Sequence, residues 1–183
     1  MSFEEKKEAT LKKLQYYLEE KEVDPPIIPL LEIINSHPGL FTTSSCSGRV
    51  MVLIDRGRKV DSEKYLTFHR TISLEDLQDL PKEGWLRVEP FILHIMAKDW
   101  ELALDVVDLV KEIGVKRSGV SRARVGYLIE MMGNVYMSAP LSHLTIDEDL
   151  ISIINQKMEK NFEVLKKVEE AFKRWIEESR RRK

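Results

Sequence analysis

The chain has 183 residues, with 29 lysine and arginine residues against 31 aspartate and glutamate residues, and a single cysteine. A chain of this length buries roughly 70% of the surface that its unfolded form exposes, so we expect one compact domain over the whole chain, residues 1–183. One cysteine excludes an internal disulfide and a cysteine-rich zinc site. The net charge of -2 gives no overall attraction to anions, so an anionic partner would have to be held by a local patch of cations.

Targeting and membrane signals are not expected. Residues 1–14 carry charge in every turn, and no stretch approaches the ~18 consecutive apolar residues that a membrane span needs. The charged fraction of 33%, with both signs interspersed, is a pattern that thermophilic proteins favour. We therefore expect a cytoplasmic protein with no membrane partner.

The N-terminal part is predicted to be helical. Ser2 and Glu5 have the spacing of a capping box, and leucines then recur at helical intervals, which predicts an amphipathic helix from residue 3 to about residue 22. Asp24 and the two prolines after it should end this helix. A short apolar helix is expected over 29–35.

Segments rich in β-branched residues follow. A polar approach over 41–49 leads into a buried strand over 50–54, and a second strand is expected over 65–70, after a charged turn at 55–63. Ser73 then caps a short helix that reaches Leu80. The longest strand candidate is WLRVEPFILHIMA, from Trp85 to Ala97.

The next segments alternate again between helix and strand. Asp99 is expected to cap an amphipathic helix that closes at Gly114, in the left-handed exit position. Two strands, over 115–131 and 135–139, would then meet in a tight turn at Gly133-Asn134.

Apolar residues at three- and four-residue steps predict one long helix from about residue 145 to the end. Residues 180–183, RRRK, are expected to form a flexible tail that adds at most a non-specific attraction to RNA. These elements together predict an α+β fold in a single domain, with a mixed or mostly antiparallel sheet packed against helices. No G-x-G-x-x-G sequence follows a strand, so a Rossmann fingerprint is absent.

The most unusual segment is TTSSCSGR, residues 42–49. Its run of hydroxyl and thiol side chains, followed by Gly48 and Arg49, offers many hydrogen-bond donors and a planar cation that can grip a carboxylate or a phosphate. The alternative is a polar strand entrance with a bulge at Gly48. Cys46 could be a nucleophile activated by a neighbouring cation, or a small buried core residue.

A second feature is a cationic segment over 116–124 that contains no acid. Strand alternation would place Arg122 and Arg124 on one face, an arrangement that suits RNA phosphates. The alternative is a solvated edge whose charges prevent strand pairing. A smaller cluster of cations consists of Arg56, Arg58 and Lys59.

The third feature is the segment EPFILH, residues 89–94. Glu89 precedes a proline in an apolar strand, where a carboxylate needs a partner or the hydroxyls of a ligand. His94 could accept a proton near neutral pH, or it could be a hydrogen-bonded core histidine. The four histidines of the chain have no metal-ligand spacing, so we predict no metal.

Four segments taken in order resemble the wybutosine-synthesising methyltransferase family, the third enzyme of that tRNA-modification pathway. They are SSCSGR at 44–49, FH at 68–69, EPFILH at 89–94 and GVKRSGV at 114–120. The resemblance implies a transfer from S-adenosyl-L-methionine to N-4 of the tricyclic 7-(3-amino-3-carboxypropyl)-4-demethylwyosine at nucleotide 37 of phenylalanine tRNA. The cofactor follows from this resemblance alone.

Three groups of site residues are predicted from the matched segments together with the chemistry of methyl transfer and the charges of the chain. Cofactor binding is assigned to Ser44, Ser45, Cys46, Ser47, Gly48 and Arg49. Proton acceptance in catalysis is assigned to His94, His69 and Glu89. Substrate and RNA binding is assigned to Lys116, Arg117, Ser118, Gly119, Arg122 and Arg124.

A second hypothesis, from a different class of protein, is a non-catalytic RNA-binding module that uses the cationic segment 116–124. Both hypotheses predict tRNA binding that weakens with salt. Only the enzyme predicts cofactor binding.

Overall fold

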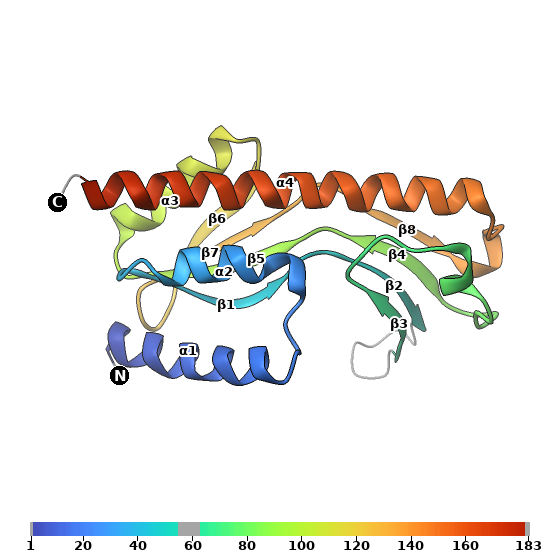
Figure 1. Ribbon diagram of the computed structural model, residues 1–183, viewed down its shortest axis with the longest axis horizontal. Coiled ribbons are helices and arrows are strands. Elements are labelled where there is room, and N and C mark those ends of the chain that lie inside the picture. The colour runs from blue at the N-terminus through green and yellow to red at the C-terminus, as the bar shows by residue number, and fades with distance from the viewer. Residues whose placement is uncertain (1, 55–62, 182–183) are drawn as a thin grey trace. The chain divides into compact units, whose positions relative to one another are not determined.

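The computed structural model describes residues 2–54 and 63–181. Three parts of the predictions therefore lie outside the described residues: the basic cluster Arg56, Arg58 and Lys59, most of the charged turn predicted at 55–63, and residues 182–183 of the predicted tail. Four α-helices are seen within the described ranges: α1 (Phe3–Glu19), α2 (Ile28–Asn35), α3 (Trp100–Glu112) and α4 (Glu148–Arg181) (Figure 1). Among the described residues, no helix carries an apolar stretch that could cross a bilayer.

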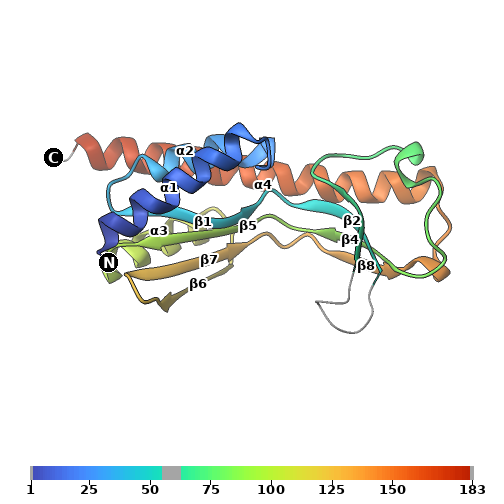
Figure 2. The same ribbon diagram turned by 90° about the horizontal axis from the view of Figure 1, so that it is seen from below.

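The described part of the chain forms two four-stranded sheets, and every strand pairing in them is antiparallel. The first sheet, seen side by side in Figure 2, has the order β1 (Leu40–Cys46), β5 (Ile92–Ala97), β7 (Tyr127–Met132) and β6 (Arg117–Arg122). The second has the order β3 (Glu63–Phe68), β2 (Arg49–Ile54), β4 (Trp85–Glu89) and β8 (Met137–Pro140). The predicted α+β class with mostly antiparallel strands is confirmed.

The chain divides into two compact units, each assembled from separated segments. The first unit consists of residues 1–47, 92–133 and 164–183, and the second of residues 48–91 and 134–163. The first sheet, α1, α2 and α3 belong to the first unit, while α4 contributes residues to both. The expectation of one domain over residues 1–183 stays a prediction.

The first unit shows why its helices begin and end where they do. The capping box of α1 is confirmed, because the Ser2 hydroxyl accepts from the Glu5 N–H at 3.1 Å and the Ser2 N–H donates to the Glu5 carboxylate at 2.6 Å. The helix ends earlier than predicted, because Lys21 takes a left-handed φ of 57° and the Glu22 N–H donates back to the Tyr17 carbonyl at 2.9 Å. Helix α3 matches its prediction from Asp99 to Gly114.

The core of the second unit lies between its sheet and the first half of α4. Val50, Val52, Leu86 and Val88 of β2 and β4 are fully buried, and they belong to one apolar cluster with residues 151, 154 and 158 of α4. The loop after β3 is tied to the same helix, since the Ile72 N–H and carbonyl both bond the Asn155 amide at 2.8 Å. The Asn155 side chain thus satisfies two backbone groups of this loop that a neighbouring strand would otherwise satisfy.

The longest predicted strand, residues 85–97, is wrong. It is two strands, β4 and β5, which belong to different sheets and are separated by Pro90 and Phe91. Proline has no N–H to donate to a strand ladder, so the break falls at the residue that cannot continue the pairing. The polar approach predicted over 41–49 is likewise a strand for most of its length, β1, and the short helix predicted from Ser73 is a single 3₁₀ turn, Leu74–Leu77.

The predicted hairpin at Gly133-Asn134 is also wrong. The hairpin joins β6 to β7 instead, and the turn is closed by a hydrogen bond of 3.1 Å from the Ala123 N–H to the Gly126 carbonyl. Gly126 has a φ of 77°, and a Cβ atom there would lie 2.3 Å from the Ala97 carbonyl oxygen. Arg124 therefore lies in the turn after β6, and it does not share a strand face with Arg122.

A buried amide on α4 fixes the backbone where β2 begins and β4 ends. Asn161, only 1% exposed, accepts a hydrogen bond of 2.7 Å from the Phe91 N–H. Gly48 packs against the same side chain: its φ is 96°, and a Cβ atom there would lie 2.4 Å from Asn161 Nδ2. Only glycine satisfies both the left-handed backbone and this close approach.

We predict that Asn161→Ala lowers the free energy of unfolding by about 1–3 kcal/mol, because the buried Phe91 N–H loses its acceptor. Urea unfolding followed by circular dichroism measures this loss. Lys160→Ala is the matched control, since Lys160 is exposed on the same helix and should change stability by no more than about 0.5 kcal/mol. Equal effects of the two substitutions would contradict the role given to the amide.

A second prediction concerns pH. The Arg70 guanidinium donates two hydrogen bonds, of 2.7 and 2.8 Å, to Asp76, and with the Ser73 N–H it holds the pKa of the Asp76 carboxyl far below its ordinary value. A lowered folded-state pKa stabilises the protein above the unfolded pKa of about 3.9, and the stabilisation is lost as pH falls. The pair is partly exposed, so we expect at most about 1 kcal/mol.

The measurement is urea unfolding of wild type and Asp76→Asn between about pH 6 and pH 2. The stability difference between the two proteins should shrink as the pH falls. A difference that stays constant, or that grows in acid, would contradict the assigned cause.

Candidate functional site

The residues predicted to bind the cofactor are divided between the two units. Ser44 to Ser47 lie at the end of β1 in the first unit, whereas Gly48 and Arg49 open β2 in the second.

In the second unit, Arg49 and Glu89 form a cross-strand ion pair between β2 and β4. Glu89 Oε2 accepts from Arg49 Nε at 2.8 Å and from Nη2 at 2.7 Å, and both side chains are about three-quarters buried. Glu89 thus has the partner that its apolar surroundings require. The guanidinium is held in one orientation, and its other N–H groups can still donate to a ligand.

His69 is oriented by the backbone of Gly48, the residue before Arg49. It follows β3 directly, and its Nδ1 atom lies 3.0 Å from the Gly48 carbonyl oxygen. A carbonyl oxygen can only accept, so Nδ1 carries the proton in the neutral ring and Nε2 carries the lone pair. Gly48, Arg49, His69 and Glu89, all in the second unit, are called the Arg49 cluster from here on.

His94 belongs to the first unit and is therefore not part of the Arg49 cluster. It lies on β5 opposite Glu130 of β7, with 3.5 Å between His94 Nε2 and Glu130 Oε1. Its side chain is 27% exposed and that of Glu130 is 58% exposed. The histidine is thus a half-buried sheet residue beside an exposed carboxylate.

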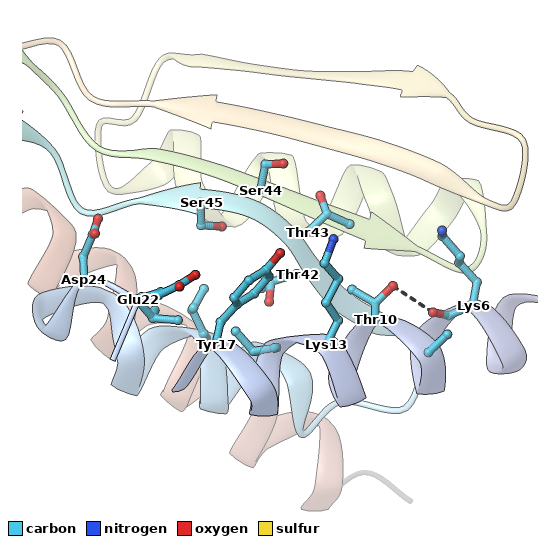
Figure 3. A pocket seen from close by; sticks show the side chains of 14 residues that line it. Lys6, Thr10, Lys13, Tyr17, Glu22, Asp24, Thr42, Thr43, Ser44 and Ser45 are labelled. Atoms are coloured by element: carbon cyan, nitrogen blue, oxygen red, sulfur yellow. Dashed lines mark hydrogen bonds between the residues drawn. The ribbon is translucent and has the colours of Figure 1, made fainter. Parts of the chain in front are cut away.

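In the first unit, a cleft of about 800 Å³ lies between α1 and β1 (Figure 3). A bulge between Thr42 and Ser45 breaks the usual alternation of β1, so that these two side chains point toward α1 while Thr43 and Ser44 project from the other side of the strand. The cleft is lined by Lys6, Ala9, Thr10, Lys13, Leu14, Tyr17, Glu22, Val23, Asp24, Leu31, Thr42, Thr43, Ser44 and Ser45. We call it the α1–β1 cleft.

The remaining members of the hydroxyl-rich segment do not line this cleft. Ser47 is fully buried, and both its N–H and its hydroxyl donate to Asp24 Oδ2, at 2.8 and 3.2 Å. These bonds give Ser47 a role in positioning the loop before α2. Cys46 is half-buried and forms no disulfide.

The cationic segment lies at the edge of the first sheet. Arg117, Ser118, Gly119 and Arg122 belong to β6, Lys116 precedes it, and Arg124 follows it in the hairpin turn. The four cations, Lys116, Arg117, Arg122 and Arg124, are exposed. Within residues 2–54 and 63–181 none of these four has a carboxylate within ion-pair distance, so they are available to an anionic partner.

Sequence analysis missed two polar residues that hold these segments in place, Asn161 and Asp24. A signal was present for the first, because Asn161 interrupts the apolar stripe of α4 between Met158 and Leu165. A polar residue at a core position needs a specific partner. Asp24 gave no such signal, because an aspartate before two prolines is typical of a helix end.

Comparison with known proteins gives a consistent result. The family model described as Methyltransferase TYW3 matches residues 5–73 and 67–177. The tRNA(Phe) 7-((3-amino-3-carboxypropyl)-4-demethylwyosine(37)-N(4))-methyltransferase 1 of Thermococcus kodakarensis is 33% identical, with 97% of each chain covered. The enzyme of the same name from Pyrococcus horikoshii is 34% identical over 92% of this chain and 93% of the relative.

A solved structure agrees with these sequences. The PH1069 protein from Pyrococcus horikoshii superimposes with a TM-score of 0.83 at 32% identity, covering 93% of this chain and 96% of that one. The family predicted from the four segments is therefore confirmed. The chain belongs to the TYW3 methyltransferase family.

Proposed function

We propose that this protein transfers a methyl group from S-adenosyl-L-methionine to N-4 of 7-(3-amino-3-carboxypropyl)-4-demethylwyosine. This base lies at nucleotide 37 of tRNA(Phe), and the transfer is a step in the biosynthesis of wybutosine derivatives. The observation that carries the proposal is the likeness to enzymes of that printed activity over 97% of both chains. Because the family is one of methyltransferases, the non-catalytic RNA-binding module is not retained. Acting on tRNA, such an enzyme belongs in the cytoplasm.

The chemistry demands positioning more than a protein nucleophile. When bound, S-adenosyl-L-methionine supplies a methyl group on a sulfonium sulfur. N-4 would form the new bond to the methyl carbon in line with the C–S bond, and the sulfur would keep the electron pair of that bond. Alignment of two reactants in this way can contribute roughly 7–11 kcal/mol in favourable cases. The protein therefore needs groups that hold a carboxylate, a nucleoside and an RNA backbone, and one group that removes the N-4 proton.

The described residues fit the first of these needs. Arg49 is a fixed guanidinium whose orientation is set by Glu89, and it suits a carboxylate or a phosphate. In β1, the buried Ser45 hydroxyl has no hydrogen-bond partner among the described residues, which is the state expected of a group that bonds a ligand. These two residues are the members of the signature that we assign to reactant binding.

His69 is our first choice for the proton acceptor. Its Nε2 atom accepts the N-4 proton, while the Nδ1–H stays bonded to the Gly48 carbonyl at 3.0 Å and stabilises the imidazolium that forms. Glu89 is a poorer acceptor, because its Oε2 already accepts two hydrogen bonds from Arg49. His94, beside Glu130, is the second choice.

The direct test combines the purified protein with methyl-labelled S-adenosyl-L-methionine and tRNA(Phe) isolated before N-4 methylation. We expect label in the tricyclic base of nucleotide 37. Absence of transfer, together with absence of cofactor binding by calorimetry, would contradict the proposal.

We predict that Arg49→Ala and His94→Ala each lower methyl transfer about tenfold or more while the protein stays folded, as circular dichroism at the assay temperature would show. Lys82→Ala, an exposed residue of the second unit, is the control and should retain full turnover. Wild-type turnover in the first two variants would show that the signature residues are structural.

A further variant separates the two histidines. His69→Asn keeps a side-chain amide that can donate to the Gly48 carbonyl, but it cannot accept a proton. If His69 is the acceptor, this variant should lose about 10²-fold or more of kcat with little change in KM. Near-normal kcat in His69→Asn combined with a large loss in His94→Ala would move the role to His94.

For the cationic segment, we predict that Arg124→Ala weakens tRNA binding and reduces the salt slope of binding by about 1, with kcat nearly unchanged at saturating tRNA. Filter binding of tRNA at several salt concentrations measures both quantities. Lys111→Ala, an exposed cation of α3, is the control. Identical slopes in the two variants would leave Arg124 without a specific role in RNA binding.

A further inference from the structure

The α1–β1 cleft carries opposite charges at its two ends. Figure 3 shows Lys6 and Lys13 of α1 toward one end and Glu22 and Asp24 toward the other, with Tyr17 between them. The two carboxylates come from the segment that follows the left-handed turn at the end of α1. A ligand with a negative and a positive group of its own would complement both ends of this cleft.

The two lysines differ from the other cations of α1. Lys12 pairs with Glu8 at 2.7 Å, and the Lys7 ammonium donates to the His37 carbonyl oxygen. Among the described residues, neither Lys6 nor Lys13 has such a carboxylate, and Lys13 lies 5.4 Å from the centre of the Tyr17 ring. Their charges are thus left for a ligand.

The strand side of the cleft also holds an unused polar group. The Thr42 hydroxyl is satisfied, because it accepts from the Asn35 amide at 2.9 Å. The Ser45 hydroxyl, which points into the cleft (Figure 3), is buried and has no partner among the described residues. A buried hydroxyl without a partner costs free energy of folding, which a ligand atom would recover.

Size and shape favour a nucleoside with an amino-acid group. The volume of about 800 Å³ lies in the range of small-molecule sites, roughly 300–1,000 Å³. Tyr17 offers an aromatic face for a flat heterocycle. A free phosphate would meet the lysines but would be repelled by the carboxylates at the other end, whereas an α-amino acid presents a carboxylate and an ammonium group together.

We propose that the α1–β1 cleft binds the α-amino-acid group of a nucleoside reactant. Its carboxylate is held by Lys13 and the Ser45 hydroxyl, and its ammonium group lies toward Glu22. This inference rests on the proposed function, because both reactants of that function carry such a group. One is the methionine part of S-adenosyl-L-methionine, and the other is the 3-amino-3-carboxypropyl group of the tricyclic base.

Two pairs of ligands distinguish these sources by calorimetry. S-adenosylhomocysteine has the amino-acid group, and 5′-methylthioadenosine is the same thioether nucleoside without it. Likewise, tRNA(Phe) with the aminocarboxypropyl base is compared with tRNA(Phe) whose tricycle lacks that side chain. The variants are Lys13→Gln, Glu22→Gln and Ser45→Ala. Lys12→Gln, on the same helix but outside the cleft, is the matched control.

In one of the two pairs we expect wild type to prefer the amino-acid-bearing ligand. Lys13→Gln should reduce the affinity for that ligand about tenfold or more and leave the affinity for the truncated ligand unchanged. Ser45→Ala, which adds neither charge nor bulk, should show a smaller loss in the same pair. The pair in which the loss occurs identifies the reactant.

Two results would overturn the inference. One is wild-type protein that prefers the amino-acid-bearing ligand in neither pair. The other is a set of variants that bind the full and the truncated ligand with equally reduced affinity. The same conclusion would follow if Lys12→Gln reduced the affinity as much as Lys13→Gln. The proposed function is judged separately by label transfer, so selective binding without transfer would remove the function and leave the cleft assignment standing.

Discussion

The contact between Gly48 and the Asn161 amide is the constraint on which the Arg49 cluster depends. Because Asn161 Nδ2 lies 2.4 Å from where a Cβ would stand, residue 48 must be glycine. The left-handed backbone at this point presents the Gly48 carbonyl to His69 and starts β2 so that Arg49 faces Glu89. One buried amide therefore sets the orientation of a histidine, an arginine and a glutamate through the backbone of Gly48 and Phe91.

Much of the helical structure could be predicted because its signals are local. Ser2 and Asp99 cap helices through bonds to residues three positions ahead, and Gly114 ends α3 through its own backbone angle. The apolar stripe of α4 likewise needs only helical periodicity. The family resemblance was equally readable, since it depends on short runs of residues whose order along the chain is preserved.

The strands and the site were harder to predict because their causes are not local. Nothing in the sequence between Trp85 and Ala97 except Pro90 shows that the strand changes sheets, and the turn at Gly126 is fixed by a close approach to Ala97. For the same reason, sequence reasoning grouped residues 44–49 as one site, whereas the structure assigns them to two units. Which side chains meet is decided by partners that are distant in sequence.

The interleaving of the two units has a consequence for synthesis on the ribosome. The chain passes between units at residues 47/48, 91/92, 133/134 and 163/164, and the second unit takes Ile151, Ile154 and Met158 from α4 while the first takes its C-terminal part. An emerging chain therefore cannot complete either core before its last helix is made, although α1 and α3 can form early. The nascent protein carries two unfinished apolar surfaces until α4 has emerged, so its period of exposure to chaperones is set by the time taken to synthesise the residues that precede this helix.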